Sequence, residues 1–423
     1  MSATQSTLLC SLGLAVASTL AVAEVPCPGQ PAAYFDCLES KGVGKFSGKV
    51  QTLLMHRDID GAGDGTSGTL AFTLNYLSPD FNGLSLGAQY INSTRLFETG
   101  DNDDAGYWLH NDDFNELNEA YLAYNFGALG CDWAKLKVGR QILNYDFSPA
   151  YNIRQKDQSF EAVVLQLEPV EGLRIDVGHL ERFSSWSSRD ASVDNTWQAG
   201  FIDIADAVFG SMPAPYSTNG MQFISATYDG LKPWSFTVYD FYGEDLYNTF
   251  GAKASHKWDL GPGSGSLTLR GHWANQQDVG RMDTDGLGPI DSNIYELGVD
   301  WARNGLTLSA GTVIVDGDRF QTPFRTSFTI DTELLWYTDQ FLGETKSAYL
   351  KGVYKTGDWL FYAMFVIDEH EDGTTCSEID AVVKYTINEC MYTSVKAGYG
   401  GRDYDQKDDS NALDLRWFVG WTF

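Results

Sequence analysis

The sequence predicts an all-β fold, a transmembrane antiparallel β-barrel of about 18 strands with short turns at one end and long loops at the other. Three observations predict it: segments in which apolar and polar side chains alternate, turns rich in glycine, proline and asparagine between them, and a strand-like C-terminus that ends in Phe423. The 423 residues include 43 Gly, 22 Tyr, 24 Phe and 12 Trp, a composition that favours β structure with many turns.

The N-terminus is expected to be removed before the protein folds. Residues 8–23 are apolar or small, and the last three of them, Ala21 to Ala23, have the small-x-small form of a signal-peptide cleavage site, although no basic residue precedes the run. We therefore expect a signal peptide over residues 1–23, a periplasmic N-terminal segment over 24–45 and the barrel over 46–423.

Alternation with a period of two continues through the chain after residue 45, where no apolar run is long enough for a membrane helix. In residues 412–423, for example, Leu415 and Trp417 share one face, opposite Asp414 and Arg416. A strand with this pattern has one apolar and one polar face. The apolar face suits lipid and the polar face suits a water-filled lumen.

The connections between the expected strands alternate between tight turns and long polar loops, the pattern of bacterial outer-membrane barrels. The first strand should rise from the side to which the last strand returns, so the count is even; we count eighteen, with sixteen as the alternative. Residues 329–337 resemble a strand, but counting them would place a tight turn at the loop end, so we assign 316–345 to one long loop. The tight turns are expected at 78–83, 168–172, 229–233, 302–305 and 355–358, and further long loops at 94–115, 183–220 and 275–292.

Aromatic residues gather near the expected strand ends, where amphipathic rings suit the two interfaces of a membrane. The alternative is the core of a soluble β-sandwich, but a sandwich needs an apolar second face, and here that face carries charged and small residues. The aromatic positions are Trp133, Trp234, Tyr239, Tyr242, Trp258, Trp359, Trp417 and Trp421.

The polar face of the expected strands carries side chains of both charge signs. Basic rows of this kind guide anions such as carboxylates, which arginine binds through two parallel hydrogen bonds. Alternatively, the charges neutralise one another and only hold water, and the sequence leaves both interpretations open. The basic residues of this face are Lys49, Lys135, Lys137, Arg174, Arg270, Lys351, Lys355, Lys384, Lys396 and Arg416, and the acidic ones are Glu119, Asp176, Glu296, Asp300, Asp380 and Asp414.

The net charge of −28 excludes nucleic acid as a partner, because the chain would repel a phosphate backbone. The acidic excess lies mainly in loops, at 101–104, 112–113, 368–372 and 403–409. Carboxylate clusters could hold calcium or magnesium and bridge to lipopolysaccharide phosphates; the alternative is an ordinary solvated surface. None of these clusters has the spacing of an EF-hand loop.

Signatures of catalysis and of bound cofactors are weak. The six histidines are scattered, Gly-x-Ser-x-Gly is absent, and no Cys-x-x-Cys indicates a zinc or redox site. We therefore expect no catalytic residue, metal or cofactor. Cys27 with Cys37 is the expected disulfide, since export leads to an oxidising compartment. The alternatives to a channel are a secreted or periplasmic β-rich carbohydrate-binding protein or hydrolase, and an outer-membrane enzyme or adhesin.

Residues 136–162 carry the most specific pattern in the chain. Gly139-Arg140-Gln141 ends an expected strand, a segment with proline and arginine follows, and Phe160-Glu161 opens the next strand. This pattern resembles the OprD-like family of specific porins and the related major outer-membrane porins. The resemblance implies an eighteen-strand barrel, commonly trimeric, with a constriction built by the third loop and a basic track for small carboxylates.

The resemblance makes Arg140, Arg154 and Lys156 candidates for the constriction, with Glu161 facing them. Arg140 has the parity of the membrane-facing Val138, so a bulge or a position beyond the membrane is required. We therefore expect an outer-membrane porin: a water-filled channel for passive diffusion of small hydrophilic solutes or ions, carboxylates among them. Its expected partners are outer-membrane lipid, lipopolysaccharide and two further copies in a homotrimer. The residues expected to line the pore are Arg140, Arg154, Lys156, Glu161, Arg174, Arg270, Lys351 and Arg416.

Overall fold

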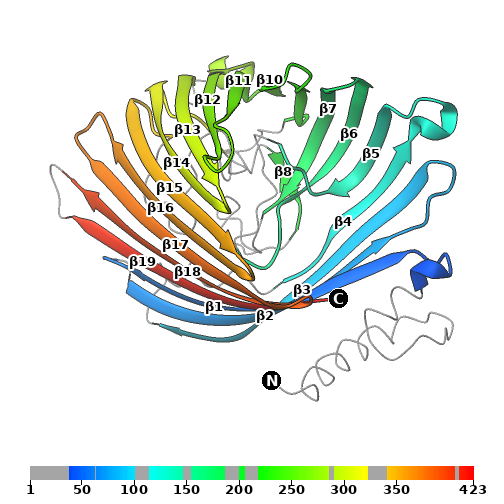
Figure 1. The fold of residues 1–423 in the computed structure, drawn as a ribbon, viewed down its shortest axis with the longest axis horizontal. Coiled ribbons are helices and arrows are strands. Elements are labelled where there is room, and N and C mark those ends of the chain that lie inside the picture. The colour runs from blue at the N-terminus through cyan, green and yellow to red at the C-terminus, as the bar shows by residue number, and fades with distance from the viewer. Residues whose placement is uncertain are drawn as a thin grey trace.

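Strands make up nearly all the regular structure of the computed structural model, and they form one antiparallel sheet that closes on itself (Figure 1). The structure describes residues 38–61, 63–100, 114–145, 154–185, 200–204, 218–284, 290–322, 341–404 and 409–423. The strands are β1 (Lys45–Ile59), β2 (Gly63–Leu77), β3 (Leu84–Gly100), β4 (Phe114–Asn125), β5 (Ala134–Gln141), β6 (Ser159–Val170), β7 (Leu173–Ser184), β8 (Ile202–Asp203), β9 (Met221–Tyr228), β10 (Trp234–Gly243), β11 (Tyr247–Asp259), β12 (Ser266–Asp278), β13 (Asp291–Arg303), β14 (Leu306–Gly317), β15 (Thr345–Thr356), β16 (Trp359–Glu369), β17 (Thr375–Asn388), β18 (Met391–Asp403) and β19 (Ser410–Thr422); the short helices are η2 (Phe126–Leu129) and α5 (Arg281–Thr284).

The ring closes between the first and last strands, where Lys49 lies opposite Thr422 and Ile59 lies opposite Ala412. The other strands pair with their neighbours in chain order, and β7 pairs with both β8 and β9. Because β8 has only two residues, eighteen long strands follow one another around the ring. A closed ring leaves no edge strand, which is the arrangement that strands in lipid require. The predicted count of eighteen is confirmed, and the sixteen-strand alternative is wrong.

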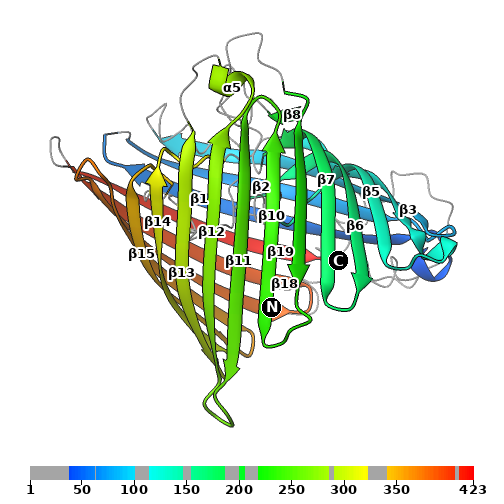
Figure 2. The same cartoon turned by 90° about the horizontal axis from the view of Figure 1, so that it is seen from above.

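The long connections lie at one end of the ring, as predicted, although that end also has three-residue connections between β1 and β2 and between β10 and β11. β6 ends at Val170 and β7 begins at Leu173, whereas β14 ends at Gly317 and β15 begins only at Thr345. The long loop expected between β14 and β15 is confirmed, and its residues 329–337 lie outside the described ranges. Figure 2 shows α5 at the long-loop end, with β10 to β13 side by side. None of the described helices is long and apolar enough to cross a membrane.

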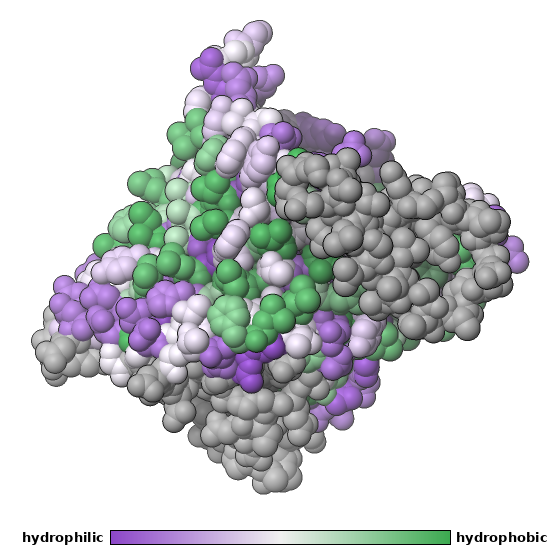
Figure 3. Space-filling view, turned by 90° about the horizontal axis from the view of Figure 1, so that it is seen from below, coloured by the Kyte–Doolittle hydropathy of each residue, from purple (hydrophilic) through white to green (hydrophobic). Residues whose placement is uncertain are grey.

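The outward face of the ring is apolar. Leu122, Val163 and Leu350 are 52%, 43% and 62% exposed, because each side chain points away from the interior of the ring. Figure 3 shows hydrophobic side chains gathered across the wall, with hydrophilic residues beside them. A soluble β-sandwich would bury such residues, so that alternative is not supported.

Most of the aromatic side chains expected at the strand ends are exposed on this outward face. Two are not: Tyr239 is 2% exposed and Trp421 is 8% exposed. Tyr239 faces the interior of the ring, and Trp421 packs on Phe423, with ring centroids 4.8 Å apart. The exposed members are Trp133, Trp234, Tyr242, Trp258, Trp359 and Trp417.

Candidate functional site

The connection between β5 and β6 turns into the ring. Of residues 142–158 the structure describes 142–145 and 154–158, and we call the second part the inward segment. Its residues Arg154, Gln155 and Lys156 are at most 1% exposed. Polar side chains can be buried so completely only when hydrogen bonds replace their water, and the Gln155 and Lys156 side chains find such partners on several different strands.

One end of the inward segment is bound to β1 and β2. Gln51 Nε2 donates to the carbonyl oxygen of Arg154 and to Gln155 Oε1, both at 3.0 Å. Gln155 Nε2 donates to Thr69 Oγ1 at 2.7 Å, and the Tyr392 hydroxyl donates to Gln51 Oε1 at 2.6 Å. These contacts join the segment to strands four and three places away from β5, so the segment crosses part of the lumen.

A buried lysine binds the same segment to β4 and β7. Lys156 Nζ donates to Ser184 Oγ at 2.7 Å, Asn118 Oδ1 at 3.0 Å and Glu116 Oε1 at 3.2 Å. These three acceptors match the three N–H donors of an ammonium group. Ser159 Oγ also donates to Asn118 Oδ1 at 2.7 Å. Burial lowers the pKa of the Lys156 amine, and the Glu116 carboxylate opposes that shift.

Arg416 belongs to a buried ion cluster in the wall. Its Nε and Nη2 donate to Oδ1 and Oδ2 of Asp414, both at 2.9 Å, and Arg57 Nε donates to Asp414 Oδ2 at 3.0 Å. The register of β1 and β19 places Arg57 directly opposite Asp414. All three residues are at most 3% exposed. Arg416 is therefore out of reach of a passing solute, which corrects the expectation that it lines the pore.

Arg270 lies between carboxylates on the inner face of β12 and β13. Its Nε is 2.8 Å from Asp300 Oδ2, its Nη1 is 3.1 Å from Glu296 Oε1, and its Nη2 donates to the Tyr349 hydroxyl at 2.6 Å. Gly298 leaves the space for this reach across two strands, because a Cβ there would lie 2.7 Å from Arg270 Nη2. The arginine is partly exposed, but its two carboxylates leave the cluster with a net negative charge.

Arg174 is paired in the same way, on β7. Its Nε and Nη2 donate to Asp176 at 2.7 and 3.2 Å. Lys351 lies opposite the buried Ser309 and Met364, which places it on the inner face as expected. The polar face could either guide anions or consist of charges that neutralise one another. The arginines of β1, β7, β12 and β19 support the second interpretation, since each forms an ion pair with a carboxylate.

Arg140 and Glu161 lie away from the inward segment. They are directly opposite each other on β5 and β6, with Arg140 Nε 2.9 Å from Glu161 Oε1, and Arg182 Nη1 is 3.7 Å from Glu161 Oε2. The next pair on the same face is Val138 and Val163, both at least 40% exposed. The register between β5 and β6 is unbroken, so no bulge turns Arg140 inward. The expectation that Arg140 and Glu161 form the constriction is therefore wrong.

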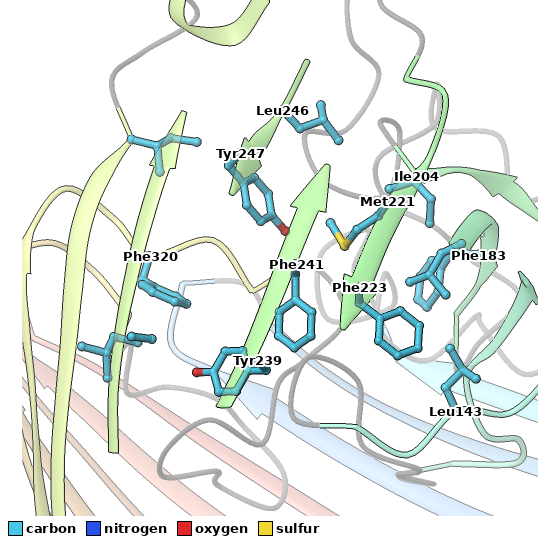
Figure 4. Close-up of a cluster of buried hydrophobic side chains, with 14 of the residues drawn as sticks. Leu143, Phe183, Ile204, Met221, Phe223, Tyr239, Phe241, Leu246, Tyr247 and Phe320 are labelled. Carbon is cyan, nitrogen blue, oxygen red and sulfur yellow. The ribbon is translucent and has the colours of Figure 1, made fainter. Parts of the chain in front are cut away.

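Apolar side chains fill part of the ring interior, although the sequence predicts polar residues on the inward face of the strands. Figure 4 shows Phe223, Phe241 and Tyr239 within this cluster. The ring centroids of Tyr239 and Phe241 are 4.8 Å apart, and Tyr145, which follows β5, packs on Phe223 at 4.8 Å. The signal that could have revealed the cluster is the run 162–165, which is apolar on both strand faces.

Comparison with known proteins agrees with this architecture. A family model described as outer membrane porin, OprD family, matches residues 65–358. No curated protein matches the chain. OpdL of Pseudomonas aeruginosa has a TM-score of 0.68 at 16% identity, and the match covers 90% of this chain and 98% of that one. OccK2 (OpdF) of the same organism, solved in complex with glucuronate, gives the same four values. OccAB2 of Acinetobacter baumannii has a TM-score of 0.70 at 14% identity and covers 89% of this chain and 98% of that one.

Proposed function

Because the chain belongs to the OprD family of outer membrane porins, we propose that small hydrophilic solutes and ions diffuse passively through its barrel, past the inward segment. One observation carries this proposal. The segment 154–158 crosses part of the lumen and is held there by buried polar contacts to β1, β2, β4 and β7. Such contacts narrow the path and keep the segment in one geometry.

We propose further that this channel does not favour anions. Carboxylates are a solute class to test, since one structural neighbour was solved in complex with glucuronate. In this chain, however, the partly exposed Arg174 and Arg270 each lie against carboxylates. The whole chain also carries a net charge of −28. A negative potential along the path raises the local concentration of cations, so cations should pass at least as readily as anions.

Planar bilayers containing the purified protein test both statements. We expect discrete conductance steps and, in a salt gradient, a reversal potential of the sign that cation preference gives. Arg270→Gln removes the positive charge between Glu296 and Asp300 and should shift that potential further toward cations. Arg140→Gln, the matched control, removes the same charge from the outward face and should not shift it.

The outcomes separate the two statements. If no conductance step appears in membranes that contain folded protein, the channel proposal fails. If steps appear but the reversal potential indicates anion preference, only the charge argument fails.

We also propose the assembly and the lipid contacts that the resemblance implies, a homotrimer whose loop end meets lipopolysaccharide. The charged residues Arg140, Glu161 and Arg182 support the second contact, because they lie on the outward face of β5 to β7, toward the long-loop end. Native mass spectrometry from detergent should give a particle of three chains, each lighter than the 46.8 kDa of the full sequence by the signal peptide, and a single chain would contradict the trimer. No catalytic step is proposed.

A further inference from the structure

A hollow of ≈ 770 Å³ opens on the inner face of the barrel at its short-turn end. Residues Arg174, Ser225, Thr227 and Thr237 of β7, β9 and β10 line it, together with Tyr145 from the connection after β5. Small-molecule sites commonly have volumes of about 300–1,000 Å³. The hollow is thus large enough for a solute of monosaccharide size, and it is separate from the buried contacts that hold the inward segment.

The wall of this hollow offers neutral hydroxyl groups beside one ion pair. The Arg174 side chain is 49% exposed; it donates to Asp176 through Nε and Nη2 and also hydrogen-bonds to Tyr145. The hydroxyls of Thr227 and Thr237 lie 2.9 Å apart, and each can donate and accept. Burial raises the pKa of the Tyr145 phenol, and this neutral hydroxyl hydrogen-bonds to Arg174 and Asp176 and so helps to fix the guanidinium in the wall. Groups of this kind match the hydroxyls of a polyol.

The rim of the hollow is acidic. Glu168 near the end of β6, Glu171 on the turn between β6 and β7, and Asp229 on the turn between β9 and β10 also line it and are exposed. With Asp176, the lining therefore includes four carboxylates and one guanidinium. Lys135 lies in the same row of the sheet as Asp176, two strands away, and is not part of the lining. This excess of negative charge repels carboxylate solutes.

We propose that this hollow is a binding site for polyhydroxylated solutes of monosaccharide size that carry no negative charge. The wall would hold the solute hydroxyls, and the rim would reject sugar acids. This inference rests on the proposed function, since a solute reaches the hollow through the lumen. It adds a second point of discrimination, at the short-turn end, to the narrowing at the inward segment.

Calorimetric titration of the full chain in detergent tests the site independently of conductance. The probes are glucose, glucosamine and glucuronate, which share a ring and differ in charge. We expect glucose and glucosamine to bind and glucuronate to bind about tenfold more weakly, a difference that a modest repulsion supplies. Replacing the three rim acids in one variant, E168Q, E171Q and D229N, should bring the affinity for glucuronate close to the affinity for glucose.

A hydroxyl-deleted variant tests the wall. The double variant Thr227→Val and Thr237→Val keeps the shape of both side chains but removes their hydroxyls. It should weaken the binding of glucose about tenfold, the effect of losing one or two hydrogen bonds. Thr307→Val is the matched control, because Thr307 has the parity of the buried Ser309 but lies on β14. It should leave glucose binding unchanged.

Glucuronate binding to the unaltered protein as tightly as glucose would overturn the site. Glucose binding equally to the double valine variant and to the unaltered protein would also overturn it. If none of the three sugars binds while bilayers show conductance, the site is also refuted and the channel stands. If conductance is absent but glucose binds as described, the channel fails and the site stands.

Discussion

Removing the Lys156 amine should release the inward segment from the wall. Lys156→Met leaves Glu116, whose side chain is 4% exposed, without its ion-pair partner. Breaking a buried pair in this way costs about 3–5 kcal/mol. If that cost falls on the bound position of the segment, the ratio of bound to released states drops by more than about a hundredfold. The double variant Lys156→Met and Glu116→Gln removes both charges of the pair. Its ratio of bound to released states should therefore be at least about tenfold higher than that of Lys156→Met alone, as expected when a whole pair is replaced.

Two assays follow the segment directly. Limited proteolysis of the purified protein should cut within residues 142–158 much faster in Lys156→Met than in the unaltered chain. Single-channel recordings should show a larger or noisier open current, because the segment no longer narrows the lumen in one geometry. Lys351→Met is the control, since it removes a lysine of the inner face elsewhere on the wall. Unchanged cleavage and current in Lys156→Met, or a double variant no better than the single one, would refute the reasoning.

Three further predictions concern the wall. Gly298→Val should displace Arg270, because even a Cβ would lie 2.7 Å from its Nη2, and we expect a loss of about 1–3 kcal/mol, seen as a lower melting temperature in detergent. Deleting Phe423 should reduce assembly in the outer membrane, since its backbone N–H and C=O pair with Gly48 at 3.0 and 2.8 Å; full recovery of folded protein in membrane fractions would contradict this. Arg416→Ala should cost about 3–5 kcal/mol of stability in a melting experiment and leave sugar binding unchanged, because this residue is buried in the wall.

The sequence alone determined the architecture of this protein. Alternation with a period of two is a local property, so residues 412–423 reveal their two faces without any knowledge of their neighbours. Tight turns likewise depend on a few adjacent residues. Sorting turns and loops to opposite ends then gave the even count, and it correctly placed a long connection between Gly317 and Thr345. The same alternation also predicts the observed position of Arg140, which lies two residues after Val138 and therefore on the same outward face.

Only the tertiary structure decided which charged residues a solute can reach. Arg154 and Lys156 were named from the sequence, but their partners on β1, β4 and β7 lie at distances along the chain that no local pattern connects. Arg57 and Arg416 meet at Asp414 because the ring closes between its first and last strands. A side chain's face follows from its own strand, whereas its burial depends on what the rest of the chain folds over it. For that reason the sequence identified a barrel with a charged interior, and the structure was needed to separate the residues that build its wall from those that face the path.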